Sequence, residues 1–229
     1  METISEGLKQ ALHLIFTLDG EIFSIVLLSL AVSLLSVGIS SLIALPAGCA
    51  IGLSEFRGKR PLGVLLHTLM GLPPVLAGLF VYLLLSRTGP LGSMQLLFTP
   101  AAMVIAQVLL IVPIMMGLAA DAVSKNGLIV WQTVRTLGAG RLKALGTLYY
   151  EMRIAFSSVL AAGFGRAISE VGAVILVGGN IKGSTRVMTT AIVLETGKGN
   201  FDRAIAIGII LLIIALVINA VLYRLQNKR

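Results

Sequence analysis

Five apolar stretches, separated by short polar or basic segments, dominate the chain. Each holds about 20 mostly apolar residues, the length that a helix needs to cross the roughly 30 Å hydrocarbon core of a bilayer. They cover residues 22–45, 62–85, 100–120, 154–177 and 204–222. Backbone groups in lipid have no water to bond with, so these stretches are predicted to be membrane-spanning helices rather than strands.

Prolines and an amphipathic segment modify this pattern. Proline lacks the N–H that a helix interior needs, so kinks or local breaks are predicted at Pro46, Pro73, Pro74 and Pro113. A segment before the first span, too short and too polar to cross a bilayer, has one apolar helical face formed by Ile4, Leu8, Leu12 and Ile15. We expect it to form an amphipathic helix along the membrane surface. No linker or internal repeat is visible, so residues 1–229 are interpreted as one all-α transmembrane domain.

Composition supports this fold class. Of the 229 residues, 57% are hydrophobic and 12% are charged, about half the charged fraction of a typical soluble domain. The mean hydropathy is +0.99. The net charge of +8 comes from basic residues between apolar runs, which favours loop charges that set topology over nucleic-acid binding. A single cysteine, Cys49, excludes a disulfide within the chain and a thiol-based metal cluster.

Lysine and arginine residues are unevenly shared between the two sets of connections. One set holds eleven, namely Arg57, Lys59, Arg60, Lys125, Arg135, Arg141, Lys143, Arg153, Arg224, Lys228 and Arg229. The opposite set holds six, namely Lys9, Arg87, Lys182, Arg186, Lys198 and Arg203. Cytoplasmic loops carry the excess of Lys and Arg. The chain is therefore predicted to be a multi-pass cell-membrane protein with its N-terminus outside and its C-terminus in the cytoplasm.

The connection from Val123 to Arg153 is long, at about thirty residues, and long connections usually have a function. Leu128 to Leu137 and Arg141 to Tyr150 have helical composition, and Gly138 between them permits a bend. Apolar and basic residues alternate at helical spacing, which favours docking into a groove on a partner. The alternative from the residues alone is an ordinary solvated loop with fraying helices.

The segment from Val134 to Arg141 resembles the signature loop of ATP-binding cassette (ABC) importer permeases. That pattern opens with Glu-Ala-Ala, has Gly six residues after the Glu, and ends in an apolar residue, a variable one, Leu and Pro. Gly138 matches the glycine, whereas the opening Gln132-Thr133-Val134 and the closing Tyr150-Glu151 depart from the pattern. The resemblance implies a coupling helix that sits in a cleft of the ATPase subunit. The implied coupling residues are Gln132, Thr133, Val134, Arg135, Leu137, Gly138, Ala139, Arg141 and Leu148.

Further segments resemble oxyanion permeases. Residues 86–92 look like their outer loop. Residues 165–174, 177–181, 185–186, 189–191 and 194–202 are similar to molybdate and tungstate permeases, closest to the tungstate type. The resemblance implies the type I ABC importer permease fold in a homodimer, with separate ATPase subunits and an extracytoplasmic oxyanion-binding protein. It implies import of tungstate, or alternatively molybdate or another anion, by alternating access. ATP and Mg²⁺ would be used by the partner ATPase, and no cofactor by this chain.

Arg166 and Glu170 are the only ionisable residues deep within a predicted span, and their spacing of four places them on one helix face. One interpretation is an internal salt bridge that orients the helix; the other is a gate or pathway element, with Ser169 and Gly172 beside it. Other polar groups also leave two interpretations open. The outer Lys182 and Arg186 are either solvated or meet an anion or the acidic surface of a delivery protein. One face of the first span is either wet or bonds across helices, through Ser29, Ser33, Ser36 and Ser40.

Two other functional classes fit the sequence less well. An ion-coupled secondary transporter is expected to carry several ionisable groups within the membrane and often internal repeats, and only one Arg–Glu pair is present. A membrane enzyme would need a nucleophile–base constellation or a metal-ligand cluster, and neither is visible. The chain is predicted not to be an enzyme, and without a nucleotide-binding loop it needs an external ATPase.

Overall fold

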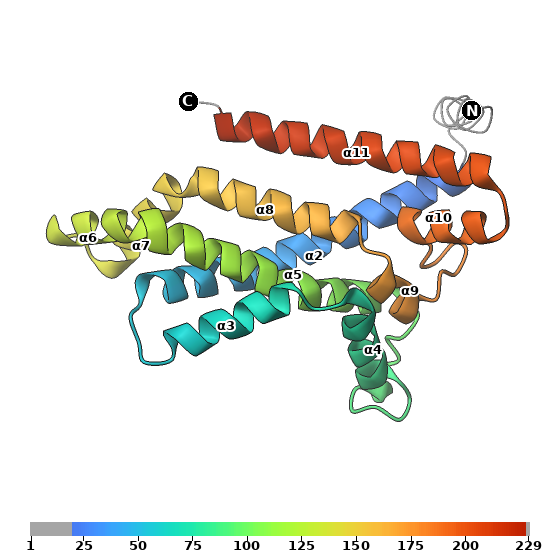
Figure 1. Ribbon diagram of the computed structural model, residues 1–229, viewed down its shortest axis with the longest axis horizontal. Coiled ribbons are helices and arrows are strands. Elements are labelled where there is room, and N and C mark those ends of the chain that lie inside the picture. Colours follow the sequence, from blue (N-terminus) through green and yellow to red (C-terminus); the bar gives the residue numbers. More distant parts are fainter. Residues whose placement is uncertain (1–19, 228–229) are drawn as a thin grey trace. The chain divides into compact units, whose positions relative to one another are not determined.

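The computed structural model describes residues 20–227 (Figure 1). The predicted N-terminal amphipathic helix lies outside these residues. The described part is helical throughout, without strands. Its elements are α2 (Gly20–Leu53), α3 (Lys59–Met70), α4 (Pro74–Leu85), the 3-10 turn η1 (Gly92–Met94), α5 (Pro100–Ala122), the π-helical turn η2 (Val123–Gly127), α6 (Leu128–Thr136), α7 (Arg141–Glu151), α8 (Arg153–Ile168), α9 (Gly172–Gly178), α10 (Met188–Gly197) and α11 (Phe201–Asn227).

Three described helices are long and apolar enough to cross a membrane: α2, the run from Pro100 to Thr136, and α11. Two bent helix pairs, α3 with α4 and α8 with α9, raise the number to five if each pair is one span. The predicted spans 62–85 and 154–177 are therefore interrupted. The break before α4 was predicted from Pro73 and Pro74, which lie at its N-cap and first position. The break at residues 169–171 contains no proline and was not predicted.

The prolines act according to their position in the helix. Pro46 and Pro113 lie inside α2 and α5, and both helices continue through them. Pro74 opens α4, where the missing N–H would have no partner in any case. The structure thus has a break at one of the three predicted proline sites.

The described chain divides into two compact units. The first contains residues 20–36, 73–107 and 165–219, and the second contains residues 37–72, 108–164 and 220–227. That the whole chain acts as one permease domain stays a prediction.

Within each unit, small residues bring helices into close contact. In the first unit α4 packs against α9, where an added Cβ on Gly78 would lie 2.6 Å from the Cα of Ala173. In the second unit α2 meets α5, where a Cβ on Gly48 would lie 2.7 Å from the Cβ of Ala119. Small residues at such contacts are typical of membrane helix pairs.

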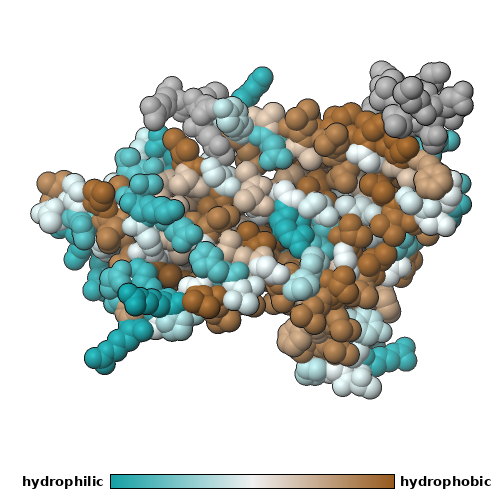
Figure 2. Space-filling model, in the orientation of Figure 1, coloured by the Kyte–Doolittle hydropathy of each residue, from teal (hydrophilic) through white to brown (hydrophobic). Residues whose placement is uncertain are grey.

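Large apolar side chains lie exposed along the long helices, and Figure 2 shows apolar residues over much of the visible face. On α2, Leu42 is 78% exposed, and on α11 Leu212 is 70% exposed. Apolar surface of this extent is unfavourable in water and is stable against lipid. The described helices therefore have the surface of a multi-pass membrane protein.

The contact between α4 and α9 makes Gly78 sensitive to substitution. Gly78→Ala would force the backbone of Ala173 to move, and overpacking of this kind costs about 1–3 kcal/mol. We expect a lower thermal midpoint for the purified protein in detergent. Gly63→Ala in α3 is the matched control, because an added Cβ there meets nothing within 4 Å. Equal midpoints for both variants would contradict the close packing of α4 on α9.

Candidate functional site

The predicted loop helices are present as α6 and α7. Between them Gly138 has a φ of +84°, in the left-handed region that glycine adopts without strain. The turn is closed by two bonds: the Ala139 N–H donates to the Val134 carbonyl at 3.3 Å, and Arg135 Nη1 donates to the Ala139 carbonyl at 2.8 Å. The sequence therefore specified both helices and the residue that turns the chain between them.

The tip of this loop carries apolar side chains that the described residues leave uncovered. Leu137 is 81% exposed and Leu142 is 86% exposed. The remaining predicted coupling residues near the tip are exposed or half-buried: Gln132, Thr133, Val134, Arg135, Gly138, Ala139 and Arg141. Exposed leucines beside arginines match the surface of a helix that docks into a groove on another protein.

Leu148, the last predicted coupling residue, lies elsewhere. It is fully buried, and a Cβ added to Gly127 in η2 would lie 3.0 Å from its Cδ1. Nearby, the ring centroids of Tyr149 and Phe156 are 5.2 Å apart. Burial, with Cys49 alongside, raises the pKa of Tyr149 to about 12, so its hydroxyl stays neutral. Leu148 thus anchors α7 against the end of the preceding helix, and any part it has in coupling acts through the position of the loop.

The break between α8 and α9 contains the predicted charge pair. Arg166 Nη1 lies 2.5 Å from Glu170 Oε2, and the Glu170 side chain is 2% exposed against 28% for Arg166. The other Glu170 oxygen accepts the N–H of Ala173 at 3.0 Å, in the first turn of α9. One carboxylate therefore compensates the charge of Arg166 at the end of α8 and caps the start of α9. It accepts a backbone N–H that would otherwise have no hydrogen-bond partner where the helix is interrupted.

Side chains from other helices satisfy the carbonyls at this break. Thr189 Oγ1 in α10 donates to the Glu170 carbonyl at 2.9 Å, and Gln107 Nε2 in α5 donates to the Ala167 carbonyl at 3.0 Å. Sequence reasoning missed both residues. Gln107 had a visible signal, because it is the one amide side chain in the predicted span 100–120.

A small cavity of about 10 Å³ adjoins the break. It is lined by Ser29, Val32, Ser33, Gln107, Ala167, Ile168, Glu170, Val187 and Thr189. Gln107 Oε1 is buried without a hydrogen-bond partner in the described part of the chain. The volume suits about one water molecule, which such an acceptor needs. It is too small for a tetrahedral oxyanion, so this cavity is not itself a substrate pocket; the gate at Arg166 and Glu170 stays a prediction.

The other predicted gate residues are placed differently. Ser169 is exposed, and its hydroxyl donates to the Gly165 carbonyl at 2.8 Å. Gly172 packs on α4, where an added Cβ would lie 2.9 Å from Val75 Cγ2. Among the four predicted gate residues, the structure joins the side chains of Arg166 and Glu170, and the Ser169 hydroxyl lies 3.3 Å from the Arg166 carbonyl. On the serine face of α2, Ser29 bonds across helices by accepting the Met188 N–H at 2.8 Å.

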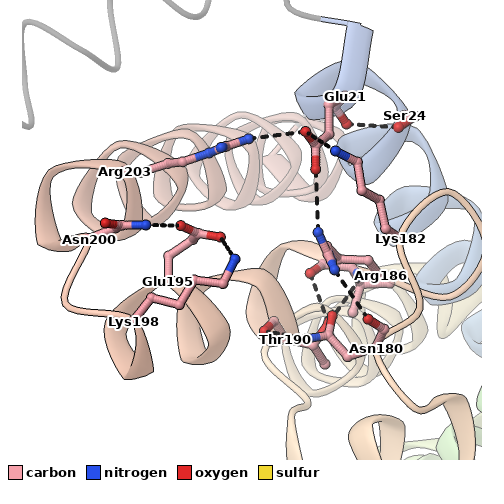
Figure 3. Close-up of polar contacts among 11 residues, drawn as sticks. Glu21, Ser24, Asn180, Lys182, Arg186, Thr190, Glu195, Lys198, Asn200 and Arg203 are labelled. Carbon is pink, nitrogen blue, oxygen red and sulfur yellow. Dashed lines mark hydrogen bonds and ion pairs between the residues drawn. The ribbon is translucent and has the colours of Figure 1, made fainter.

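The outer basic residues meet a carboxylate of the same chain (Figure 3). Glu21, at the start of α2, lies 3.0 Å from Lys182 Nζ and 3.3 Å from nitrogen atoms of both Arg186 and Arg203. Arg186 also donates to the Asn180 carbonyl at 3.5 Å. Lys182 and Arg186 were expected to be solvated or to meet an anion or the acidic surface of a delivery protein. The ion pairs with Glu21 were not predicted, and the Lys182 side chain is still 68% exposed. Glu21 joins segments more than 150 positions apart in the sequence.

A second acidic group, Glu195, predicts a pH dependence of stability. It accepts a hydrogen bond from Asn200 at 2.8 Å and pairs with Lys198 at 3.0 Å. The Asn200 bond and then Lys198, with Arg203 farther off, hold its pKa below the ordinary value of 4.5 against the opposing effect of burial. A depressed pKa gives stability that is present above the unfolded-state value and is lost as pH falls through the folded-state value.

Glu195→Gln should therefore lower the thermal midpoint near neutral pH, and its difference from the wild type should shrink as pH falls below about 4.5. The measurement is thermal denaturation of the purified protein across an acid pH series. Glu151→Gln is the control, because Glu151 is exposed and makes no ion pair among the described residues. Parallel profiles for Glu195→Gln and the wild type would contradict the predicted linkage.

Comparison with known proteins establishes the family. No protein-family model matches the sequence. The chain is 43% identical to the tungstate uptake system permease protein TupB of Peptoclostridium acidaminophilum over 228 residues, which cover 100% of both chains. It is 37% identical to the Campylobacter jejuni protein of the same name, over 99% of this chain and 95% of that one. The chain belongs to the tungstate uptake permease family. The molybdenum transport system permease protein ModB of Escherichia coli is a more distant relative, 32% identical over 89% of this chain and 94% of its own.

Family membership confirms the sequence-based resemblance and the class of membrane transport protein. The permease is a multi-pass membrane subunit of an ABC importer. The match to the Peptoclostridium acidaminophilum protein extends over the entire chain, so it includes both the loop from Val123 to Arg153 and the break between α8 and α9.

Proposed function

We propose that this permease carries tungstate into the cell. The observation that carries the proposal is the match over the full length to a tungstate uptake permease at 43% identity. Molybdate is the second candidate, supported by the 32% identity to a molybdenum transport permease. Both are tetrahedral oxyanions, so a pathway for one suits the other in charge and shape.

Transport is driven by a separate ATPase, which uses ATP and Mg²⁺; this chain binds no cofactor and catalyses no reaction. The contact with the ATPase is made by the loop from α6 to α7. Its exposed Leu137 and Leu142 and its basic Arg135 and Arg141 support this assignment. Leu148 and Gly127 hold the loop on η2, so that a movement of the tip is transmitted to the helix that begins at Pro100.

The complete importer contains two copies of this permease, two ATPase subunits and an extracytoplasmic oxyanion-binding protein. The pathway lies between the two permease copies, which alternate between inward-open and outward-open states as ATP binds. The N-terminus is outside and the C-terminus is cytoplasmic. The excess of Lys and Arg on the side of the α6–α7 loop supports this orientation.

The test is transport in liposomes that contain the permease and its ATPase, with the binding protein added outside. We expect ATP-dependent accumulation of tungstate, and we expect excess molybdate to compete less well than unlabelled tungstate. Uptake that proceeds without the ATPase would indicate an ion-coupled transporter and would overturn the proposal. A preference for molybdate over tungstate would replace the first candidate with the second.

A further inference from the structure

The loop between α4 and α5, residues 86–99, joins the two helices through the 3-10 turn η1 (Figure 1). The Leu91 N–H donates to the Leu84 carbonyl at 3.0 Å, which folds the loop onto the end of α4. The Phe98 N–H donates to the Val177 carbonyl of α9 at 2.8 Å. Gln95 and Phe98 have φ values of +51° and +63°, which residues with side chains adopt only when their surroundings impose it.

This loop encloses a cleft of about 620 Å³. Its lining consists of Leu85, Arg87, Gly92, Ser93, Gln95, Leu97 and Phe98. Arg87, Ser93 and Gln95 can donate hydrogen bonds, and no acidic residue is among the lining residues. The cleft is thus open and is lined by hydrogen-bond donors and one positive charge.

Arg87 differs from the other basic residues predicted to lie outside. Among those that the structure describes, Lys182, Arg186 and Arg203 pair with Glu21, and Lys198 pairs with Glu195. The Arg87 side chain makes no ion pair and no hydrogen bond within residues 20–227. Its positive charge is therefore not compensated by any residue that the structure describes, which leaves it available to a ligand.

We propose that this cleft is a transit site for the imported oxyanion. The guanidinium of Arg87, the hydroxyl of Ser93 and the amide of Gln95 donate to the oxygens of a tetrahedral dianion, whose apolar backing is Leu85 and Phe98. Arg has five donors in a planar fork, which suits two oxygens of one anion. The concave lining favours a small anion over a docked protein surface. Because Arg87 is exposed, the site is weak, and a site on a transport route must release its ligand.

The site rests on the proposed import of an oxyanion, so binding and transport are measured separately. Binding of inorganic tungstate to the permease–ATPase complex in lipid nanodiscs is followed by equilibrium dialysis, with the binding protein omitted. Arg87→Gln removes the charge and is expected to weaken tungstate binding about tenfold, the loss for one charge-assisted bond. Arg87→Lys keeps the positive charge but lacks the planar guanidinium, so it should weaken tungstate binding less than Arg87→Gln does.

Arg57→Gln is the matched control. Arg57 is an exposed arginine in the turn between α2 and α3, lines no part of the cleft, and its side chain makes no hydrogen bond or ion pair among the described residues. The Arg57→Gln variant should bind tungstate as tightly as the wild type does. ATP-dependent import by the wild type, in liposomes with the binding protein, tests the proposed function independently of any variant.

Two results would overturn the site. One is an absence of saturable tungstate binding by the wild-type complex. The other is equal tungstate binding by the wild type and Arg87→Gln, and weaker association of the binding protein with that variant would then make the cleft a protein-docking surface. If the wild type binds tungstate through Arg87 but does not import it, the transit site stands and the proposed function fails.

Discussion

Gly138→Val is expected to abolish most ATP-driven uptake while the permease stays folded and inserted. Gly138 turns the chain between α6 and α7 with a φ of +84°, and a residue with a Cβ pays about 1–2 kcal/mol to hold a left-handed conformation. A β-branched side chain fits this region least well. An added Cβ at this position meets nothing within 4 Å, so the substitution strains the backbone without a clash. The turn should open, which displaces the exposed Leu137 and Leu142 from the positions in which we propose that they dock.

Gly138→Asn is the matched control, because asparagine tolerates the left-handed region. We expect it to retain most of the uptake and most of the affinity for the ATPase. The measurements are tungstate uptake in liposomes, co-purification with the ATPase, and the thermal midpoint of the permease alone. The midpoint should be similar in all three proteins. Normal uptake by the valine variant would remove the α6–α7 turn from the coupling pathway.

The loop was predictable because its structure depends on neighbours in the sequence. Two helical segments separated by Gly138 are local features, and α6 and α7 begin and end within about one residue of the predicted limits. Leu148 shows the limit of such reasoning. Its apolar character was recognised, but its burial against η2 follows from packing, which the local pattern does not record.

The outer charges were less predictable because their partner is distant in the sequence. Lys182 and Arg186 have no acidic neighbour within eight positions, so solvent or an external anion was the available interpretation. The structure places Glu21 beside them, across more than 150 residues of chain. Arg87, for which no anion contact was predicted, is the one member of that Lys and Arg set within residues 20–227 that makes no ion pair with a described residue.

The break at residues 169–171 was hidden for a different reason. Residues 154–177 are apolar throughout apart from Arg166, Glu170 and serines, so their hydropathy matches an uninterrupted span. The interruption is stabilised by polar groups from α5 and α10, through Gln107 and Thr189. Hydropathy records how well a segment tolerates lipid and gives no information on side chains that other helices supply. The spacing of Arg166 and Glu170 marked this part of the chain as unusual, but it did not predict that the helix ends at residue 168.

Glu170→Ala is expected to destabilise the permease by about 3 kcal/mol. Removing one partner of a buried pair costs about 3–5 kcal/mol, because the other charge is left uncompensated. The lower end applies because the Arg166 side chain is 28% exposed and retains some solvation. The variant also leaves the Ala173 N–H without its acceptor at the start of α9. The measurement is the free energy of unfolding in bicelles, supported by the thermal midpoint.

A double-mutant cycle separates the ion pair from the helix cap. Arg166→Met alone should destabilise at least as much as Glu170→Ala, because it leaves the 2% exposed Glu170 carboxylate without its counter-charge, although that carboxylate still accepts the Ala173 N–H. Arg166→Met with Glu170→Ala should recover part of the loss from Glu170→Ala, because no uncompensated charge remains. Glu170→Gln retains an oxygen that can accept the Ala173 N–H. Its free energy of unfolding should lie between those of the wild type and Glu170→Ala. Additive effects of the two single substitutions would show that Arg166 and Glu170 act independently, and the carboxylate would then stabilise the break through α9 alone.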